Sequence, residues 1–492
     1  MHWLTERWRR WTALPLLANV AAASGGKVVF FGASLVRNVV LARLLAPADF
    51  GAWSLGLVWL QYAQWTHLSI LNAFRLDGAR LRGGGQAAEV DRLRRLTWTA
   101  CVLPAVLVGA VAAIVAGLYP DPHFRPAIVM LAGLILPFQF YAFATSCLSV
   151  EERFGLLARL QTLYAVVNLV LTVGLTWRWG FAGAVIAQIG SYLAVLLIYR
   201  RHFPIVTRPY FDRDLFWVQL QIGLPVGLNG LVYSVFVTID RTLVVSLLGL
   251  AALGQYGMTS LARSSIGLLP DAISEVVYMR LSTRYGETRN VAALVPIAIL
   301  ADRLLALVVA PVIGLAVIWV PWAIQWMLPA YQPGISALQI FLLGLFFLFP
   351  VYAGVVLTSI GRAAELLVLY ALATTGQAAF IWVGIQILGI TGAAAGTLGG
   401  GVLVFLLVNG WGFFRAGVRP TQITRHVVAC TIPFLMLGLG LGAAAAIGWA
   451  AGPSRGWPLA ELGASLLFLT VNMPYAAFAA LRLRRQLRGP YA

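Results

Sequence analysis

The run TWTACVLPAVLVGAVAAIVAGL, residues 97–118, contains no charged side chain. A transmembrane α-helix needs about 20 consecutive apolar residues to cross the hydrocarbon core, so this run predicts a membrane-spanning helix. The whole chain has the same character, because 60% of its 492 residues are hydrophobic and only 11% are charged. Soluble domains carry about 25% charged residues. The sequence therefore predicts an all-α polytopic membrane protein and excludes a water-soluble enzyme, a disordered chain and a secreted disulfide scaffold.

Apolar runs of similar length recur along the chain, bounded by charged residues or by proline and glycine. Their number predicts about 14 transmembrane helices. The predicted spans are residues 17–43, 47–73, 97–118, 126–149, 159–177, 181–199, 217–247, 250–275, 294–320, 336–358, 366–385, 390–412, 427–450 and 460–481.

Basic residues are distributed unevenly between the segments that join these spans. The 35 lysines and arginines exceed the 17 acidic residues, which gives a formal net charge of +18. With the N-terminus placed inside, the outer segments carry only four basic residues, namely Arg43, Arg125, Arg178 and Arg455. Cytoplasmic loops carry the excess of lysine and arginine in membrane proteins, so both termini are predicted to be cytoplasmic and the number of spans even. The net positive charge then predicts that the protein contacts the anionic headgroups of membrane lipids and that it does not bind nucleic acid.

The two halves of the chain repeat each other. The motif GFAGA at residues 180–184 aligns with GITGA at residues 389–393, at an offset of 209, and Arg153 then matches Arg362. Upstream, LLAPADFG at residues 44–51 aligns with LLGLAALG at residues 247–254, at an offset of 203, which places Arg37 opposite Asp240. Six helices in each repeat make the two halves parallel, so their pseudo-two-fold axis is expected along the membrane normal with a substrate path between them.

This repeat divides the chain into four predicted parts. Residues 1–199 form an N-terminal six-helix lobe, and residues 200–216 form a cytoplasmic connector. Residues 217–412 form a C-terminal six-helix lobe, and residues 413–492 add two helices and a basic cytoplasmic tail.

Basic side chains also occur inside the predicted spans. A charge in the hydrocarbon costs several kcal/mol, so it usually faces the interior of the helix bundle or a watery cavity. Arginine forks suit phosphate oxygens, and lysine acts as a point charge. We therefore predict a cationic site for an anionic ligand, formed by Lys27, Arg37, Arg241 and Arg263. Snorkelling and structural ion pairs are the alternative interpretations.

Acidic and neutral polar residues accompany these cations. Three carboxylates are predicted to balance the positive charge or to bind a coupling proton, namely Asp240, Asp271 and Glu275; Asp240 is also the simplest partner for Arg37 or Arg241. Amides and aromatic faces suit sugars, so a sugar-lining role is predicted for Gln61, Gln64, Asn229 and Tyr233. Aromatic residues are also enriched at membrane interfaces, which is the competing interpretation.

Motifs for chemistry are missing from the sequence. The stretch Gly25-Gly26-Lys27 lacks the Ser or Thr of a phosphate-binding loop, and no His-Glu-x-x-His occurs. The three cysteines fall inside apolar runs, which predicts packing roles without a disulfide or a metal. We therefore expect a transporter that is not an enzyme and that needs no cofactor.

Three motifs resemble the polysaccharide and O-antigen flippase family (Wzx type) of the multidrug/oligosaccharidyl-lipid/polysaccharide exporter superfamily. They are RLLAPADFG at residues 43–51, IDR at residues 239–241 with its following LLG, and LPAYQP at residues 328–333. The resemblance covers most of residues 17–412. It implies two six-helix lobes around a V-shaped central cavity that opens alternately to each side of the bacterial plasma membrane.

The resemblance also implies a function. Such proteins move polyprenyl-diphosphate-linked oligosaccharides from the inner to the outer leaflet for lipopolysaccharide or exopolysaccharide biosynthesis. By this resemblance, Lys27 and Arg263 hold the diphosphate in mid-membrane, and Arg37 and Arg241 assist release at the outer mouth. A polysaccharide polymerase and the export machinery are implied as partners.

Three other functions compete with this interpretation. A lipid II flippase shares the superfamily and the expected number of helices. A multidrug antiporter also shares the superfamily, but its cationic substrates favour an acidic cavity. A membrane polysaccharide polymerase or ligase would need a long outer loop, whereas the outer segments here are short.

Overall fold

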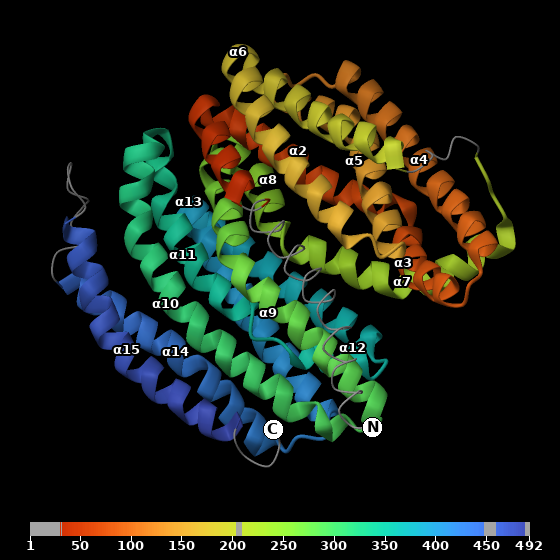
Figure 1. Ribbon diagram of the computed structural model, residues 1–492. Coiled ribbons are helices and arrows are strands. Elements are labelled where there is room, and N and C mark those ends of the chain that lie inside the picture. The colour runs from red at the N-terminus through yellow and green to blue at the C-terminus, as the bar shows by residue number, and fades with distance from the viewer. Residues whose placement is uncertain (1–29, 31, 203–208, 447–458, 488–492) are drawn as a thin grey trace. The chain divides into compact units, whose positions relative to one another are not determined.

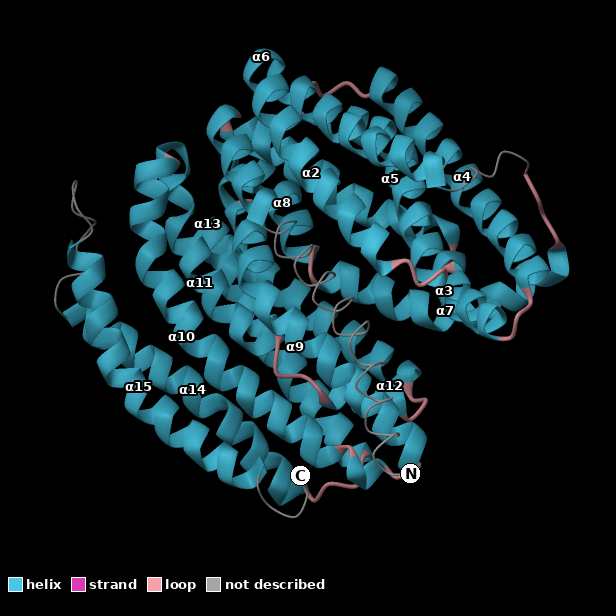
Figure 2. Cartoon of the chain, in the orientation of Figure 1, coloured by secondary structure: helices cyan, strands magenta, loops and turns pink. Residues whose placement is uncertain are grey.

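The computed structural model describes residue 30 and residues 32–202, 209–446 and 459–487. Every regular element in these residues is a helix (Figure 2). This confirms the predicted all-α membrane fold. The chain divides into two compact units, Met1–Leu231 and Val232–Ala492, each of which is considered by itself.

The first unit begins, in its described part, with a helix over residues 32–44. It continues with α2 (Pro47–Ala63), α3 (Ile70–Gly83), α4 (Ala87–Leu118), α5 (Arg125–Val150), α6 (Phe154–His202) and most of α7 (Arg213–Phe236) (Figure 1). The short 3-10 turn Gln64–His67 separates α2 from α3.

The second unit contains α8 (Ile239–Tyr256), α9 (Met258–Thr288), α10 (Val295–Met327), α11 (Ile335–Leu345), α12 (Ala353–Ser359), α13 (Ala363–Arg415), α14 (Pro420–Ala446) and α15 (Leu459–Leu487). The helices α14 and α15, which lie outside the predicted repeat, pack along α10 (Figure 1). The indole Nε1 of Trp319 on α10 donates a hydrogen bond to Ser465 Oγ on α15 at 3.0 Å.

Nine helices in the described residues are long and apolar enough to cross a membrane, or up to ten if the bent pair Ile239–Tyr256 and Met258–Gly267 is one span. The structure therefore does not confirm the predicted number of about 14 transmembrane helices. One reason is that α6 and α13 each contain two of the predicted spans. Another is that the predicted span 47–73 is split between α2 and α3, and most of residues 17–31 lie outside the described residues.

Each of the long helices α6 and α13 is a hairpin. A straight helix of the 49 residues of α6 would be about 70 Å long, more than twice the hydrocarbon thickness of about 30 Å. The chain instead reverses at Gly180 (φ 55°, ψ −133°) in α6 and at Gly389 (φ 57°, ψ −134°) in α13. Glycine adopts this positive φ without the penalty that a Cβ brings. The two glycines are 209 residues apart, so the sequence repeat has the same backbone geometry in both halves.

The turns that precede the two hairpins also match at this offset. Glu152 (φ 54°) and Gly361 (φ 81°) both have positive φ. The Arg153 N–H donates to the Leu148 carbonyl at 3.0 Å, and the Arg362 N–H donates to the Leu357 carbonyl at 2.9 Å. This bond satisfies a carbonyl at the end of the preceding helix, as in a Schellman motif.

The helix α7 packs closely on the 3-10 turn Gln64–His67 and on the start of α3 in the first unit. A Cβ at Gly223 or Gly227 would overlap Ser69, and one at Gly230 would overlap the Trp65 ring. Gln219 Nε2 on α7 also donates to Asp77 Oδ2 on α3 at 2.8 Å. Small residues at this spacing allow close helix approach. The compact units divide at Leu231, whereas the lobe boundaries at residues 199 and 217 stay a prediction.

Candidate functional site

The Arg37 guanidinium in the helix 32–44 is bound by amide oxygens. It donates to Asn38 Oδ1 at 2.6 Å, to Asn168 Oδ1 at 2.9 Å and to Gln188 Oε1 at 3.4 Å. No carboxylate forms an ion pair with Arg37 within the part of the chain that the structure describes. Amide dipoles stabilise the guanidinium here, but they leave its net charge intact.

The amides that hold Arg37 belong to a buried network between the two arms of the α6 hairpin. Asn168 Nδ2 donates to Gln188 Oε1 and to Ser191 Oγ, both at 3.0 Å. Gln188 Nε2 in turn donates to the Tyr164 hydroxyl, whose ring stacks on Tyr192 with 5.2 Å between centroids. These partners leave the two amide oxygens little freedom to rotate, so they fix the position of the Arg37 fork.

Asp240, the residue opposite Arg37 in the repeat, lies in a buried network of its own in α8. Its Oδ2 accepts a hydrogen bond from the Tyr256 hydroxyl at 2.9 Å, and its Oδ1 accepts one from the Arg241 backbone N–H at 2.8 Å. The Tyr256 hydroxyl also lies 3.3 Å from Thr397 Oγ1 on α13. A tyrosine and a backbone amide therefore contact this carboxylate, rather than the Arg241 side chain that the sequence suggested.

Two further predicted cations lie in the second unit. Arg263 on α9 donates to the Tyr233 hydroxyl at 3.0 Å, and the Tyr233 ring meets the Tyr370 ring edge-on at 5.5 Å. Arg241 is half-buried, and its Nε has no hydrogen-bond partner among the residues that the structure describes. Neither arginine forms an ion pair in the described residues. The fourth predicted cation, Lys27, lies outside the described residues.

The remaining predicted sugar-lining and charge-balancing residues differ in their burial and their contacts. Gln61 is half-buried on α2, and the Gln64 backbone carbonyl accepts a bond from Gln139 Nε2 at 3.5 Å. Asn229 Nδ2 donates to the Pro225 carbonyl one turn earlier, at 3.0 Å. Asp271 is exposed on α9, and the Glu275 side chain lies outside what the structure describes.

Three polar features were not predicted from the sequence. The amides Asn168 and Gln188 carry no charge, and only the hairpin register brings them together. Arg75 on α3 donates through Nε to Ser146 Oγ at 2.8 Å. A signal for Asn168 and Gln188 was available, because a polar side chain inside an apolar run is unusual.

The third feature is a buried pair in the second unit. Asp302 Oδ2 on α10 lies 3.2 Å from His426 Nε2 on α14. The other oxygen, Oδ1, accepts the Tyr352 backbone N–H at 2.9 Å, where the chain breaks between α11 and α12. Asn409 Nδ2 donates to the Pro350 carbonyl in the same break at 2.8 Å. The pair thus satisfies backbone that the helix break frees and ties α14 to the lobe.

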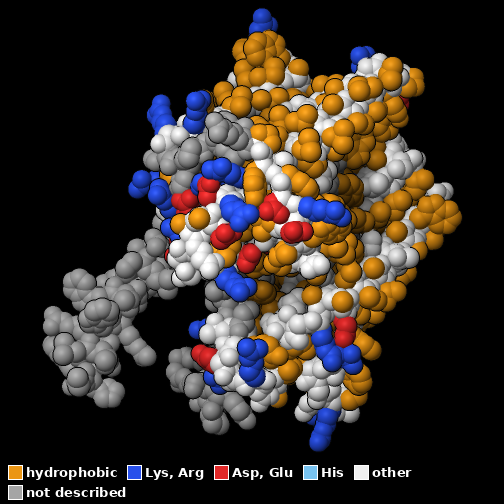
Figure 3. Space-filling view, turned by 90° about the vertical axis from the view of Figure 1, so that its right-hand side faces the viewer, with side chains coloured by type: hydrophobic (Ala, Val, Ile, Leu, Met, Phe, Trp, Pro, Cys, Tyr) orange, Lys and Arg blue, Asp and Glu red, His pale blue; other side chains and the backbone are white. Residues whose placement is uncertain are grey.

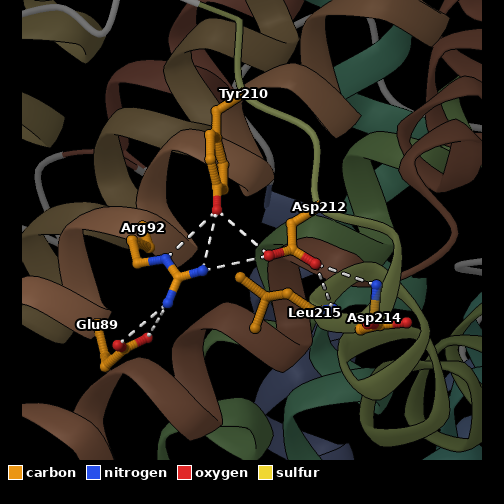
Figure 4. Close-up of polar contacts among 6 residues, drawn as sticks. All are labelled: Glu89, Arg92, Tyr210, Asp212, Asp214 and Leu215. Atoms are coloured by element: carbon orange, nitrogen blue, oxygen red, sulfur yellow. Dashed lines mark hydrogen bonds and ion pairs between the residues drawn. The ribbon is translucent and has the colours of Figure 1, made fainter.

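Outside the spans, a polar cluster anchors the start of α7 to α4 (Figure 4). Arg92 donates to the Tyr210 hydroxyl at 3.2 Å and to Asp212 Oδ2 at 3.2 Å. Asp212 Oδ1 accepts the backbone N–H groups of Asp214 and Leu215, both at 3.1 Å, so Asp212 caps α7. The Leu215 N–H contributes most to holding the pKa of Asp212 below its usual range.

Charged side chains of both signs intermingle on one face of the molecule, within a largely hydrophobic surface (Figure 3). On α4, Asp91 pairs with Arg94 and Arg95, and Glu151 pairs with Arg94 and Arg153. The described residues contain no group of three or more His, Cys, Asp or Glu side chains arranged to hold a metal ion.

One protein family and several solved structures are similar to this chain. The model of the polysaccharide biosynthesis protein family matches residues 16–274. No curated protein sequence matches the chain. Among solved structures, the lipid II flippase MurJ in an inward closed conformation is similar with a TM-score of 0.69 at 13% identity, over 96% of this chain and 100% of that one.

Two other solved structures are similar. An inward-facing MATE family multidrug transporter of the MOP superfamily has a TM-score of 0.67 at 18% identity, over 80% of this chain and 95% of its own. A MOP superfamily transporter from Pyrococcus furiosus has a TM-score of 0.55 at 18% identity, over 81% of this chain and 94% of its own. At these identities the likeness shows a shared fold.

Proposed function

Since the chain belongs to the polysaccharide biosynthesis protein family, we propose that it is a flippase for a polyprenyl-diphosphate-linked oligosaccharide. It would move this lipid from the inner to the outer leaflet of the bacterial plasma membrane by alternating access. The termini would lie in the cytoplasm, and a polysaccharide polymerase and the export machinery would receive the product. No step of this transport requires bond chemistry by the protein.

The observation that carries the proposal is the environment of Arg37. Its fork is oriented by buried amide oxygens at 2.9 Å and 3.4 Å, and no carboxylate neutralises it in the described residues. A guanidinium that is fixed but still charged attracts an anion, and its planar fork matches phosphate oxygens. A diphosphate that leaves water at the membrane surface needs such a partner to offset its desolvation.

The other arginines of the predicted site support the same substrate class. In the described residues, Arg263 makes one hydrogen bond, to the neutral Tyr233 hydroxyl, and the Nε of Arg241 has no hydrogen-bond partner. In our proposal Arg263 and Lys27 hold the diphosphate in mid-membrane, and Arg37 and Arg241 assist its release on the outer side. The Tyr233 ring, with Gln61, Gln64 and Asn229, would contact the sugars while the polyprenyl tail remains in the bilayer.

The carboxylates would serve charge balance. Asp240 already accepts two hydrogen bonds, one of them from the Tyr256 hydroxyl, so it stabilises the second unit without neutralising an arginine side chain. Asp271 and Glu275 on α9 are the remaining proposed sites for charge compensation or for a coupling proton.

A lipid II flippase is the second candidate, because the MurJ structure covers 96% of this chain. Lipid II also carries a polyprenyl diphosphate, so the arginines suit both lipids and the sugar distinguishes them. A multidrug antiporter fits less well, because cationic substrates would meet arginines that form no ion pair within the described residues.

The test is a leaflet-accessibility assay with purified protein in liposomes. A labelled polyprenyl-diphosphate oligosaccharide, lipid II or a cationic dye is supplied. A sugar-cleaving enzyme outside reports which lipid becomes exposed, and fluorescence reports movement of the dye. We expect exposure of the oligosaccharide lipid that depends on the protein. Exposure of lipid II alone would support the second candidate, and movement of the dye alone would contradict the flippase proposal.

A further inference from the structure

A cavity of about 410 Å³ opens on the first unit, between the start of α5 and the bend of the α6 hairpin. Its walls are apolar and include Val129 from α5, with Phe181, Ala182, Val185 and Ile186 from the second arm of α6. Arg125, the first residue of α5, is the one charged residue that lines it. The volume lies within the range of small-molecule sites, about 300–1,000 Å³.

The cavity lies at the ends of membrane-spanning segments. Arg125 begins one candidate span, and Val129 follows one helical turn later, about 6 Å further along the axis. Ile186 lies six residues beyond the bend at Gly180, about 9 Å into the other span. The apolar walls therefore lie within the spans, while the charge lies at the mouth.

The tryptophans beside the bend support this position of the cavity mouth relative to the membrane. Trp177 and Trp179, which flank Arg178, are 78% and 54% exposed. Exposed tryptophans gather at the headgroup level of a bilayer, where one side of the ring is apolar and the other wet. The bend, and with it the mouth of the cavity, thus lies at the membrane interface.

We propose that this cavity binds a phospholipid of the surrounding leaflet, with an acyl chain along Val129 and Ile186 and the phosphate on Arg125. This arrangement suits an amphiphilic lipid, because the cation lies at the membrane interface and the apolar walls extend from it toward the hydrocarbon. Arg125 forms no ion pair in the described part of the chain, so its guanidinium is available to the phosphate. Its place at the N-terminus of α5 adds the positive end of the helix dipole.

The equivalent place in the second unit is filled by protein. At the offset of 209, Arg125 corresponds to Gly334, where a Cβ would lie 2.7 Å from the Gln255 carbonyl oxygen. Val129 is 49% exposed, whereas its counterpart Leu338 is 5% exposed. Ala394, the counterpart of Val185, is fully buried. The opening is therefore a feature of the first unit and does not follow from the repeat.

The experiment measures lipid binding by native mass spectrometry of the whole protein in mild detergent. Dioleoylphosphatidylglycerol is titrated in, and dioleoylglycerol, which lacks the phosphate, serves as the comparison lipid. Two variants remove different parts of the site: Arg125→Gln removes the charge, and Ala182→Phe fills the groove. Arg178→Gln is the matched control, because Arg178 is an exposed arginine at the same level that does not line the cavity.

We expect Arg125→Gln to weaken the tightest phosphatidylglycerol site by about tenfold, as the loss of one charge-assisted contact predicts. Ala182→Phe should abolish that site, Arg178→Gln should leave it unchanged, and dioleoylglycerol should not distinguish Arg125→Gln from the unmodified protein. Because Arg125 and Ala182 are both exposed, we expect neither substitution to disturb the core. An unchanged melting temperature of each variant would verify this. Unchanged binding in both variants, or an equal loss in Arg178→Gln, would overturn the proposal.

Discussion

Arg37 in the first unit and Asp240 in the second occupy equivalent positions of the repeat, yet they carry opposite charges. Arg37 reaches Gln188 on the α6 hairpin directly, at 3.4 Å. Asp240 reaches Thr397, the counterpart of Gln188, through the hydroxyl of Tyr256. The repeat thus determines where a polar side chain meets its hairpin, and the residue type determines which sign of charge is placed there.

The interiors of the two hairpins differ in a related way. In α6, Asn168 and Gln188 fill the space between the arms with hydrogen-bonded amides. Beside the bend the arms approach closely in both hairpins, at Gly183 and at Gly392. Further from the bend, α13 has Gly396 and Gly400 where α6 has Ala187 and Ser191, and a Cβ at either glycine would overlap the other arm, at Ile381 or at Gln377. The first hairpin can therefore hold a cation, whereas the second is built for close packing.

Removing the charge of Arg37 should have the largest effect on transport. We expect Arg37→Gln to slow flipping of a polyprenyl-diphosphate oligosaccharide by about tenfold to a hundredfold, because a charge-assisted contact is worth about 1.5–3 kcal/mol. Initial rates in liposomes measure this. Arg37→Lys should keep part of the rate, and Arg43→Gln in the same helix should keep all of it. An unaltered rate in Arg37→Gln would remove Arg37 from the site.

Adding a carboxylate beside Arg37 should nearly reproduce that loss. In Asn168→Asp the new carboxylate would occupy the position of an oxygen that lies 2.9 Å from the guanidinium, and it would neutralise the charge. We expect about a tenfold slower flipping rate, because the new carboxylate forms an ion pair with Arg37. We also expect a lower melting temperature, because an aspartate cannot donate to Gln188 Oε1 and Ser191 Oγ as the Asn168 amide does. The same liposome assay and a thermal melt are the measurements. Normal flipping would show that an uncompensated charge is not needed.

The packing of the hairpins gives a smaller effect, on stability alone. Gly392→Ala and Gly183→Ala each place a methyl group against backbone, at Gly384 and Leu175 respectively. Overpacking of this kind costs about 1–3 kcal/mol of the free energy of unfolding. Gly174→Ala is the control, because nothing lies within 4 Å of a Cβ at Gly174. Thermal denaturation in detergent distinguishes them, and equal melting temperatures for all three variants would contradict the close approach.

The smallest effect is expected at the cap of α7. The lowered pKa of Asp212 means that its carboxylate stabilises the folded protein above the ordinary aspartate pKa of about 4. This contribution is lost as the pH falls through the lowered folded-state pKa. The difference in melting temperature between the unmodified protein and Asp212→Asn should therefore shrink on acidification from about pH 6 to pH 3. A difference that does not change with pH would exclude this role of Asp212.

The sequence predicted the fold class because apolar length alone identifies membrane helices. It also predicted both hairpin bends, since the repeat places Gly180 and Gly389 between predicted spans and both have positive φ. The count of about 14 spans is not confirmed. Most of residues 17–31 lie outside the described residues, and a 3-10 turn splits the predicted span 47–73, which composition does not report.

The candidate site was only partly accessible to sequence reasoning. Arg37 stood out as a charge in an apolar helix, but its partners Asn168 and Gln188 are 131 and 151 residues away. Asp302 and His426 are 124 residues apart and on helices that no motif links. Such pairs depend on tertiary packing, and a pattern of spacing along one helix cannot reveal them.

In the proposed transport, an uncompensated arginine selects a diphosphate. The most direct test of this selection is the affinity of the protein in lipid nanodiscs for a polyprenyl-diphosphate oligosaccharide and for the matching polyprenyl-monophosphate oligosaccharide. We predict that the unmodified protein binds the diphosphate lipid more tightly and that Arg37→Gln removes most of this preference. Equal preference for the diphosphate in both proteins would contradict the account.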